Sequence, residues 1–316
     1  MNKIFPIFII LTFSLITAAQ EKKKVDIRNA DYTYINNEKH PDYWRLIGNV
    51  NIFHNETNMF CDSAYYFSEN EKIIAFNNIK ITKGDNLNLY GEKLNYDGEN
   101  NLAIISSNVL FKNNKSQLTT EELKFNLKEN IIYYETKSRI IKENQDIRSN
   151  VGSYNLDEEK YEFRDSVIFS SDKYLLKTNK LISYENKNNS KLIGPSYVYF
   201  DDKTIFCNEG YITKNSAEFF NNASITTNDI KIASDSIYYD EIKKSILTLG
   251  NVVLTDTINN LLISSNEAIF LEVEEKMTFK KEPCLKLMSN DDTLTVYSKI
   301  FESYSNKGET TIHAKS

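Results

Sequence analysis

The sequence predicts an all-β protein, folded as an elongated antiparallel β-jelly roll of about nine strand-pair repeats of ~29 residues each. Two motifs alternate along the chain at this period. No sustained helical periodicity or helix-capping pattern competes with them. The composition agrees, because the 316 residues include 20 Tyr and 18 Phe but only 9 Gly and 4 Pro. Aromatic and β-branched residues favour strands.

The first motif is a small polar pair followed by alternating β-branched or aromatic residues. Its copies begin at Gly48-Asn49-Val50, Asn77-Asn78-Ile79, Ser107-Asn108-Val109, Asp165-Ser166-Val167, Ser196-Tyr197-Val198, Ala223-Ser224-Ile225 and Gly250-Asn251-Val252. A weaker copy lies near Ser138-Arg139-Ile140. A period kept over so many copies indicates a repeat architecture.

The second motif lies between these copies and ends in an aromatic residue. Its copies cover Asp62–Tyr66, Glu92–Asp97, Glu122–Asn126, Gly152–Asn155, Asn179–Tyr184, Asp235–Asp240 and Asn266–Phe270. The last aromatic residues of the first five copies (Tyr66, Tyr96, Phe125, Tyr154 and Tyr184) are 29 or 30 residues apart. This regularity supports a single repeating unit.

Polar turn signals recur about every 14 or 15 residues, which predicts strands of about 10 residues joined by tight turns, roughly 18 strands in all. The alternation of apolar residues changes parity across Tyr90–Lys93 and again between Ile232 and Ile237. A bulge or bend at these points would keep one face of each strand directed inward.

A single file of strands with no helix to cover it must cover itself, so the sheet is expected to roll until its two inner faces meet. We expect one repeat domain over residues 20–316. Pro195 and Pro283 should mark edges or kinks, and Pro195 is a candidate boundary between two lobes. Residues 307–316 show no clear signal for a closing strand.

The first 19 residues have the layout of a secretory signal peptide. Lys3 supplies positive charge, residues 4–16 are almost wholly apolar, and Thr17-Ala18-Ala19 are small. This predicts export with cleavage after Ala19. The alternative is an uncleaved anchor, for which the apolar stretch is short. Lys22, Lys23 and Lys24 are interpreted as a solvated flank, with contact to lipid phosphates as the other interpretation.

Charge and composition exclude several classes of function. The formal charge of −6 removes the basic footprint that nucleic-acid binding requires. Three scattered His residues and no nucleophile motif predict a protein that is not an enzyme and holds no metal or cofactor. Cys61, Cys207 and Cys284 show no metal spacing and are expected to be small core residues.

The signal peptide and the repeat together resemble the OstA/LptA family, which comprises periplasmic lipopolysaccharide-transport proteins and the N-terminal domain of the outer-membrane translocon. The closest match is Leu46–Val50 followed by Asp62–Tyr66, and the second is Asp235–Asp240 followed by Leu249–Val253. The resemblance extends from about Ile27 to Phe301. The Tyr-rich and Asn-rich version is similar to the longer OstA-like proteins of the Bacteroidetes type.

This resemblance implies a periplasmic protein that binds and transports lipopolysaccharide in outer-membrane assembly, in association with the outer membrane. A roll open along one seam would shield the lipid A acyl chains and leave the sugars in water. Each buried methylene is worth about 0.8 kcal/mol. The implied partners are lipopolysaccharide, other transport components with the same jelly roll paired through edge strands, and further copies joined head to tail.

The candidate lipid-facing residues are the inward residues that follow the first motif. They are Val50, Ile52, Ile79, Ile81, Val109, Phe111, Val167, Phe169, Val198, Phe200, Val252 and Leu254. An ordinary sandwich core has the same sequence pattern, so a purely structural role stays open for each of them. Tyr66, Tyr96, Tyr154, Tyr184 and Tyr239 are expected to cap the roll with their rings inside and hydroxyls outside.

Two other classes of function stay open. One is an exported structural or adhesive β-repeat scaffold with no lipid ligand. The other is an enzyme on a β-roll, which would need Asp, Glu and Arg clustered on one strand face, and the sequence shows no such cluster.

Overall fold

A computed structural model of the protein describes residues 24–36, 40–85, 87–187, 189–200, 202–289, 292–306 and 309–315. The predicted signal peptide over residues 1–19 lies outside these residues, as do Lys22 and Lys23. Within the described part, all regular secondary structure is β-strand. No helix in that part has the length and hydrophobicity needed to cross a membrane.

The described residues form 25 strands of one antiparallel sheet. They are β1 (Asp26–Asn29), β2 (Tyr32–Asn36), β3 (His40–His54), β4 (Thr57–Phe67), β5 (Lys72–Lys83), β6 (Leu87–Asp97), β7 (Leu102–Lys112), β8 (Gln117–Asn126), β9 (Ile131–Tyr134), β10 (Ser138–Lys142), β11 (Gln145–Ser149), β12 (Val151–Asn155), β13 (Lys160–Ser170), β14 (Leu175–Tyr184), β15 (Asn189–Tyr199), β16 (Thr204–Ile212), β17 (Ser216–Thr226), β18 (Ile230–Asp240), β19 (Ser245–Asp256), β20 (Leu261–Leu271), β21 (Lys276–Lys280), β22 (Cys284–Met288), β23 (Thr293–Tyr297), β24 (Ile300–Asn306) and β25 (Glu309–Lys315).

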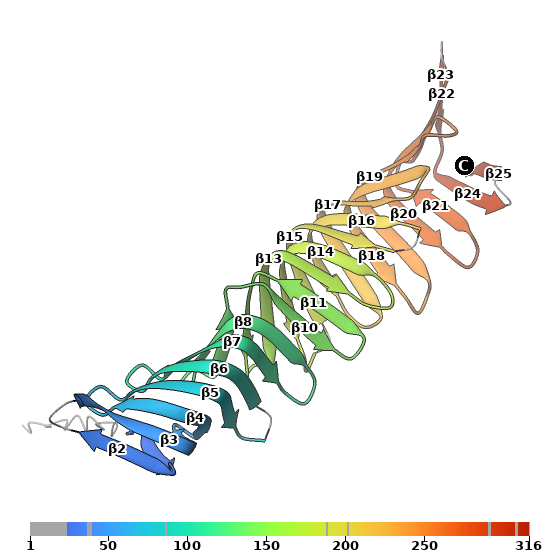
Figure 1. The fold of residues 1–316 in the computed structure, drawn as a ribbon. Helices are drawn as coiled ribbons and strands as arrows, with labels where there is room; N and C mark the ends of the chain where they lie inside the picture. Colours follow the sequence, from blue (N-terminus) through green and yellow to red (C-terminus); the bar gives the residue numbers. More distant parts are fainter. Residues whose placement is uncertain are drawn as a thin grey trace, which may run out of the picture.

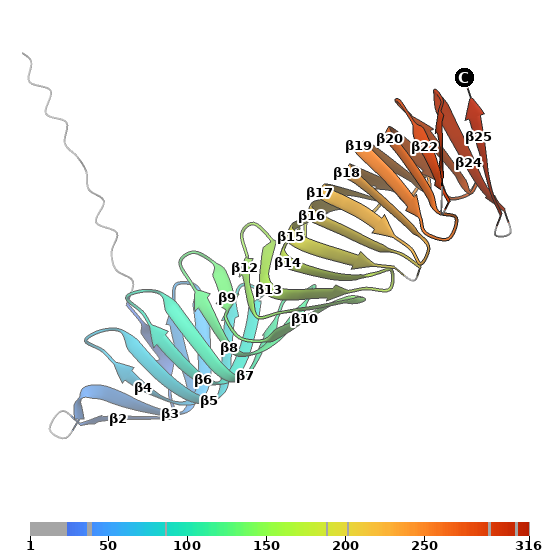
Figure 2. The same ribbon diagram turned by 90° about the horizontal axis from the view of Figure 1, so that it is seen from above.

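The strands stack in sequence order into an elongated, twisted roll with β1 to β3 at one end and β24 and β25 at the other (Figures 1 and 2). Five pairs of short strands share one level each: β1 with β2, β9 with β10, β11 with β12, β21 with β22, and β23 with β24. The described segments therefore amount to twenty levels, close to the roughly 18 strands predicted. The predicted all-β jelly roll is confirmed.

Each long strand bends near its middle, and the first motif forms this corner. In β5 the corner is Asn77 and Asn78, whose φ angles are 60° and 49°. In the strands between these, the alternation of inward and outward side chains shifts by one residue at the bend instead. The register shift of β6 falls between Tyr90 and Lys93, and one in β18 falls between Ala233 and Ser236, which confirms both predicted bends.

The residues of the two motifs explain why the chain bends at these points. Asn, Asp and Gly tolerate the left-handed backbone conformation better than other residues. The Asn of the first motif also donates a hydrogen bond to the Asp that opens the second motif on the preceding strand. The distance from Asn78 Nδ2 to Asp62 Oδ2 is 2.8 Å, and that from Asn251 Nδ2 to Asp235 Oδ2 is 3.0 Å. The two motifs are therefore the two sides of one corner.

Bending turns the two halves of the sheet toward each other, and their inward side chains form the core. One hydrophobic cluster runs from Val25 to Ile246 and a second from Val252 to Phe301. The first cluster continues past Pro195, because Leu192 and Val198 on either side of it are both buried members of that cluster. Pro195 itself lies at the corner of β15, where the pairing register shifts, as a kink would require.

Two expectations were wrong, one about the C-terminal segment and one about the tyrosine hydroxyls. Strand β25 closes the described chain by pairing with β24, although its polar sequence gave no strand signal. The hydroxyls of Tyr96 and Tyr154 do not point outward. Tyr96 forms a hydrogen bond with His54 Nδ1, and Tyr154 donates to Glu185 Oε2 at 3.4 Å. A buried hydroxyl requires such a partner.

Cys61 and Cys207 are core residues as predicted, whereas Cys284 belongs to neither hydrophobic cluster. Cys61 and Cys207 are buried, Cys284 is half-buried, and all three are free. Burial raises the pKa of the Cys61 and Cys207 thiols to about 12.

Candidate functional site

The candidate site is the seam, the line opposite the corners along which two rows of strand-connecting turns face each other. The first rim consists of the turns that follow β3, β5, β7, β10, β13, β15, β17 and β19. The second rim consists of the turns that follow β4, β6, β8, β12, β14, β16, β18 and β20. Because each long strand is bent at its corner, its two ends come back together, and the two rims meet at the seam.

Near the N-terminal end, neutral and cationic hydrogen bonds close the seam. Asn55 of the first rim donates a hydrogen bond to the side chain of Asn101 of the second. Lys83 Nζ lies 3.0 Å from the carbonyl oxygen of Leu127 and also contacts the Asn130 side chain. Burial lowers the pKa of Lys83. Lys83 is therefore held at the seam by uncharged oxygens.

The pairing of the rims changes register halfway along the roll. In the N-terminal half, hydrogen bonds across the seam join residues 42 to 48 positions apart. In the C-terminal half, Lys173 pairs with Glu241 and Lys203 with Glu272, over 68 and 69 positions. One rim is therefore displaced along the other between these two regions.

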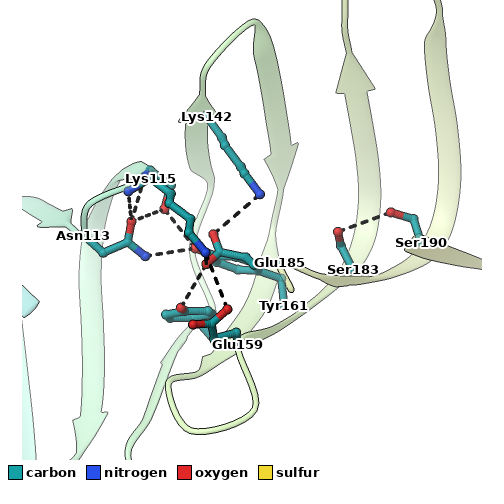
Figure 3. A network of polar contacts seen from close by, with 10 residues as sticks. Asn113, Lys115, Lys142, Glu159, Tyr161, Ser183, Glu185 and Ser190 are labelled. Atoms are coloured by element: carbon teal, nitrogen blue, oxygen red, sulfur yellow. Dashed lines mark hydrogen bonds and ion pairs between the residues drawn. The ribbon is translucent and has the colours of Figure 1, made fainter. Parts of the chain in front are cut away.

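The change of register falls at a cluster of charged residues, the clasp, formed by Lys115, Lys142, Glu159 and Glu185 (Figure 3). Lys115 Nζ lies 3.5 Å from Glu159 Oε2 and 3.6 Å from Glu185 Oε2. Lys142 Nζ lies 3.6 Å from Glu185 Oε1. The Glu185 side chain is only 3% exposed, and its Oε1 atom has no hydrogen-bond partner among the residues that the structure describes. The clasp thus contains a buried carboxylate whose hydrogen bonding is incomplete.

Neutral groups surround the clasp and hold its turn in place. Ser116 Oγ and the Tyr161 hydroxyl are 2.9 Å apart, and Asn113 Nδ2 lies 3.4 Å from the same hydroxyl (Figure 3). Ser190 donates to Ser183 at 3.2 Å beside the Glu185 turn. Burial, and secondarily the charge of Glu185, raises the pKa of Tyr154. Tyr154 and Tyr161 therefore act as neutral hydrogen-bonding groups.

A cavity of about 720 Å³, the mouth, opens on the C-terminal side of the clasp. The edge of the mouth carries Lys142, Glu143, Asp172 and Lys173 from the first rim, and Thr213 and Lys214 from the second. Its floor is apolar and consists of Ile140, Ile147, Phe163, Phe169 and Leu181. In the part of the chain that the structure describes, no hydrogen bond or ion pair joins the turn after β16 to the first rim. The mouth is thus located where the displaced rims leave a turn without a cross-seam partner.

Further cavities follow along the seam on both sides of the mouth. One of about 210 Å³ is lined by Leu87, Phe111 and Glu185 on the N-terminal side of the clasp. One of about 240 Å³ is lined by Lys173, Lys203 and Glu272. A larger one of about 620 Å³ lies between the two hydrophobic clusters and is also lined by Lys203 and Glu272. Cavities of several hundred Å³ are the size that binds small molecules.

Both rims carry charges of both signs, since Glu143, Asp172 and Asp202 of the first rim and Lys214 of the second also line the cavities, but the contacts that cross the seam have one orientation. The first rim supplies lysines to the seam, namely Lys83, Lys115, Lys142, Lys173 and Lys203, and the second supplies glutamates, namely Glu159, Glu185, Glu241 and Glu272. The lysines recur every 27 to 32 residues. This period is the signal that sequence reasoning missed, because each lysine is one of many in polar turns.

The twelve predicted lipid-facing residues all lie on the inner face. Eleven of them are buried, and Phe200 is half-buried. Phe111, Phe169 and Phe200 line cavities on the seam, whereas Val109 lines a surface hollow on the corner side. The structure therefore brings three of the twelve to the seam cavities described here.

Most residues of the mouth floor were not predicted. Ile140 and Leu181 were visible only as parts of motif copies, near Ser138 and within Asn179–Tyr184, and Ile147 and Phe163 carried no separate signal. The weakness of that repeat was itself informative, since β9 and β10 are separated at the corner instead of forming one continuous bent strand. Among the described residues, no group of three or more His, Cys, Asp or Glu side chains is placed to hold a metal ion.

Comparison with known proteins places the chain in a family. A solved crystal structure that matches is that of LptH from Pseudomonas aeruginosa, described as the LptA-homologous periplasmic component of the conserved lipopolysaccharide transport device. It shares 7% sequence identity with a TM-score of 0.23, and the match covers 54% of this chain and 95% of LptH. That likeness adds no detail to the fold described above. No curated protein matches this chain. The profile of OstA-like proteins matches residues 22–179, half of the sequence, and the chain therefore belongs to the OstA-like family.

Proposed function

We propose that this protein is a periplasmic component of lipopolysaccharide transport that carries the acyl chains of its lipid inside the roll. The observation that carries the proposal is the mouth, a cavity of about 720 Å³ with an apolar floor, in a chain of the OstA-like family. Acyl chains on the floor would be removed from water, while a polar headgroup would stay at the rim. Each methylene buried in this way contributes about 0.8 kcal/mol.

The ends of the roll support a place in a larger assembly. Among the described residues, strands β1 and β2 at one end pair only with β3, and β25 at the other end pairs only with β24. Tyr32 and Tyr34 are largely exposed at the first end. Unpaired strand edges accept further strands. In this proposal, other jelly-roll components or further copies dock there and extend the interior. Export by a cleavable signal peptide predicts removal of residues 1–19, which the mass of the protein from its own host tests.

The direct test is organic extraction of the protein purified from its own periplasm, followed by mass spectrometry of the extract. Stoichiometric lipid A or lipopolysaccharide is the expected result. Ile147→Trp fills the mouth from its floor and should lower the bound lipid about tenfold, a change of about 1.4 kcal/mol. Ile141→Trp is the matched control, because Ile141 is 45% exposed and lines none of the cavities.

The outcomes separate two functions. A protein that carries no lipid and takes up no added lipopolysaccharide would contradict transport and favour the exported scaffold. Equal lipid content in both Trp variants would place the lipid elsewhere than in the mouth.

A further inference from the structure

The ion pairs across the seam are arranged as partitions between successive cavities. Lys142 lines the mouth, and its partner Glu185 lines the 210 Å³ cavity. Lys173 lines both the mouth and the 240 Å³ cavity. Lys203 and Glu272 line both the 240 Å³ and the 620 Å³ cavities. A lipid whose acyl chain moves along the interior, with its headgroup at the seam, must therefore pass each of these ion pairs.

The ion pair between Lys173 and Glu241 is a weak closure of the seam. Lys173 Nζ lies 2.6 Å from Glu241 Oε1, but the two side chains are 63% and 32% exposed. Ion pairs of this exposure contribute about 0–1 kcal/mol to stability. The hydrogen bond from Lys173 lowers the pKa of Glu241, so the carboxylate stays ionised at neutral pH. In the clasp, Glu185 Oε1 is buried without a hydrogen-bond partner among the described residues. Little free energy is therefore lost when Glu241 leaves Lys173 for water, whereas Glu185, at 3% exposure, and the pair of Lys203 and Glu272, at 23% and 25%, cost more to open.

The orientation of the pairs is constant, with the lysine on the first rim and the glutamate on the second. We propose that Lys142, Lys173 and Lys203 form a rail for the phosphate of an anionic amphiphile, which replaces the glutamate at each lysine and so opens the seam at that point. This inference rests on the proposed function, since it requires acyl chains in the cavities. It adds the headgroup site and the chemical class of headgroup that the seam admits.

The exchange of a carboxylate for a phosphate would make the seam select anionic headgroups over neutral ones. A phosphate oxygen forms a charge-assisted hydrogen bond with a lysine, as the carboxylate does. Each lysine then keeps an anionic partner beside the apolar interior, and the released glutamate is hydrated at the rim. A neutral headgroup offers no such exchange, because it would leave the lysine without a counter-charge in a partly desolvated place.

The test compares two lipids with the same acyl chain, oleoyl lysophosphatidate and monoolein, by calorimetric titration below their micellar concentrations. The protein should bind the phosphate lipid at least about tenfold more tightly than the neutral one. Lys173→Met and Lys203→Met should each remove most of this preference by weakening lysophosphatidate binding, while monoolein, which no longer leaves a lysine without a counter-charge, should bind at least as tightly as before. Glu241→Gln and Glu272→Gln should strengthen lysophosphatidate binding, because the competing anion is lost.

Matched controls are Lys177→Met and Lys191→Met. Both lysines lie on the outer face over tyrosine rings, at 5.5 Å from Tyr199 and 5.1 Å from Tyr211. They carry the same charge change but should leave both lipid affinities unaltered. Inorganic phosphate at millimolar concentration is a further arm: displacement of the lipid by phosphate alone would identify a free-anion site in place of a headgroup site.

Equal binding of both lipids, or an equal loss of both in Lys173→Met, would overturn the rail, because the lysines would then serve only to close the seam. If neither lipid binds to the protein or to any variant, the proposed function itself fails. Should a Met variant lose its β-sheet circular dichroism, Glu241→Gln decides the question through its predicted gain of affinity.

Discussion

Gly250 and Asp235 lie opposite each other at the corner where β18 and β19 bend, and a Cβ on Gly250 would come within 2.3 Å of Asp235 Oδ2. Gly250 has a φ of 76°, and its neighbour Asn251 holds the Asp235 carboxylate by a hydrogen bond. The same approach recurs near the other end of the roll, where a Cβ on Gly48 would lie 2.3 Å from Asp31 Oδ2. The corner therefore requires both a left-handed backbone and close contact.

We expect Gly250→Ala to destabilise β18 and β19 more than Gly84→Ala destabilises β5 and β6. Both glycines have positive φ, so each substitution has the backbone cost of about 1–2 kcal/mol. A Cβ on Gly84 meets nothing within 4 Å, whereas one on Gly250 displaces Asp235. The lost hydrogen bond adds about 1 kcal/mol. Native-state hydrogen exchange of the four strands measures the difference, and equal costs would contradict this account.

The three cysteines should differ sharply in reactivity in the native protein. With a pKa of about 12 and buried side chains, Cys61 and Cys207 hold almost no accessible thiolate at pH 8. Cys284 is half-buried at the start of β22. Brief alkylation with iodoacetamide followed by peptide mass spectrometry should therefore modify Cys284 first. Labelling of all three in urea is the control, and early labelling of Cys207 would show that the roll opens at that level.

Truncation of two buried isoleucines should reveal which part of the interior is already hollow. Ile79 and Ile140 are 1% and 2% exposed, yet Ile140 lines the mouth and Ile79 lines none of the cavities described. Ile→Ala substitutions in packed cores cost about 2–5 kcal/mol. Ile79→Ala should fall in the upper part of that range and Ile140→Ala in the lower part, since Ile140 already lacks packing on one side. Hydrogen exchange of β5 and β10 in moderate urea provides both values, and the reverse order would contradict an open mouth.

The C-terminal strands should loosen in acid. The hydrogen bond from Lys315, followed by those from Tyr304 and Lys276, lowers the pKa of Glu302 from 4.5 to about 2. A carboxylate whose pKa is lower in the folded state stabilises that state above its unfolded pKa. This stabilisation should therefore be present above pH 4.5 and be lost as the pH falls towards 2.

Hydrogen exchange of β24 and β25, corrected for the intrinsic pH dependence of amide exchange, measures this loss. Glu302→Gln has no carboxylate to protonate, so its protection at these strands should be lower at neutral pH and should not fall further between pH 4.5 and 2. A pH response of the same size in the Gln variant would assign the loosening to other groups.

Local features of the chain were predictable from the sequence alone. The repeat of ~29 residues, the strand-and-turn alternation and the bends at Tyr90–Lys93 and near Ser236 depend on residues within one or two turns of each other. The preference of Asn, Asp and Gly for a left-handed backbone, and of alternating apolar residues for one face, acts over that short range. The twelve inward residues followed from the same alternation, and all twelve lie on the inner face.

The seam was decided by the tertiary structure. Which lysine meets which glutamate depends on how far the twist accumulated over many strands displaces one rim along the other. That displacement changes the spacing of cross-seam partners from 42–48 residues to 68 and 69, and it leaves the mouth where the change occurs. No short-range preference encodes a sum over many strands. The sequence by itself therefore determined the repeating bent strand, and only the rolled sheet determined the clasp, the mouth and the order of the cavities.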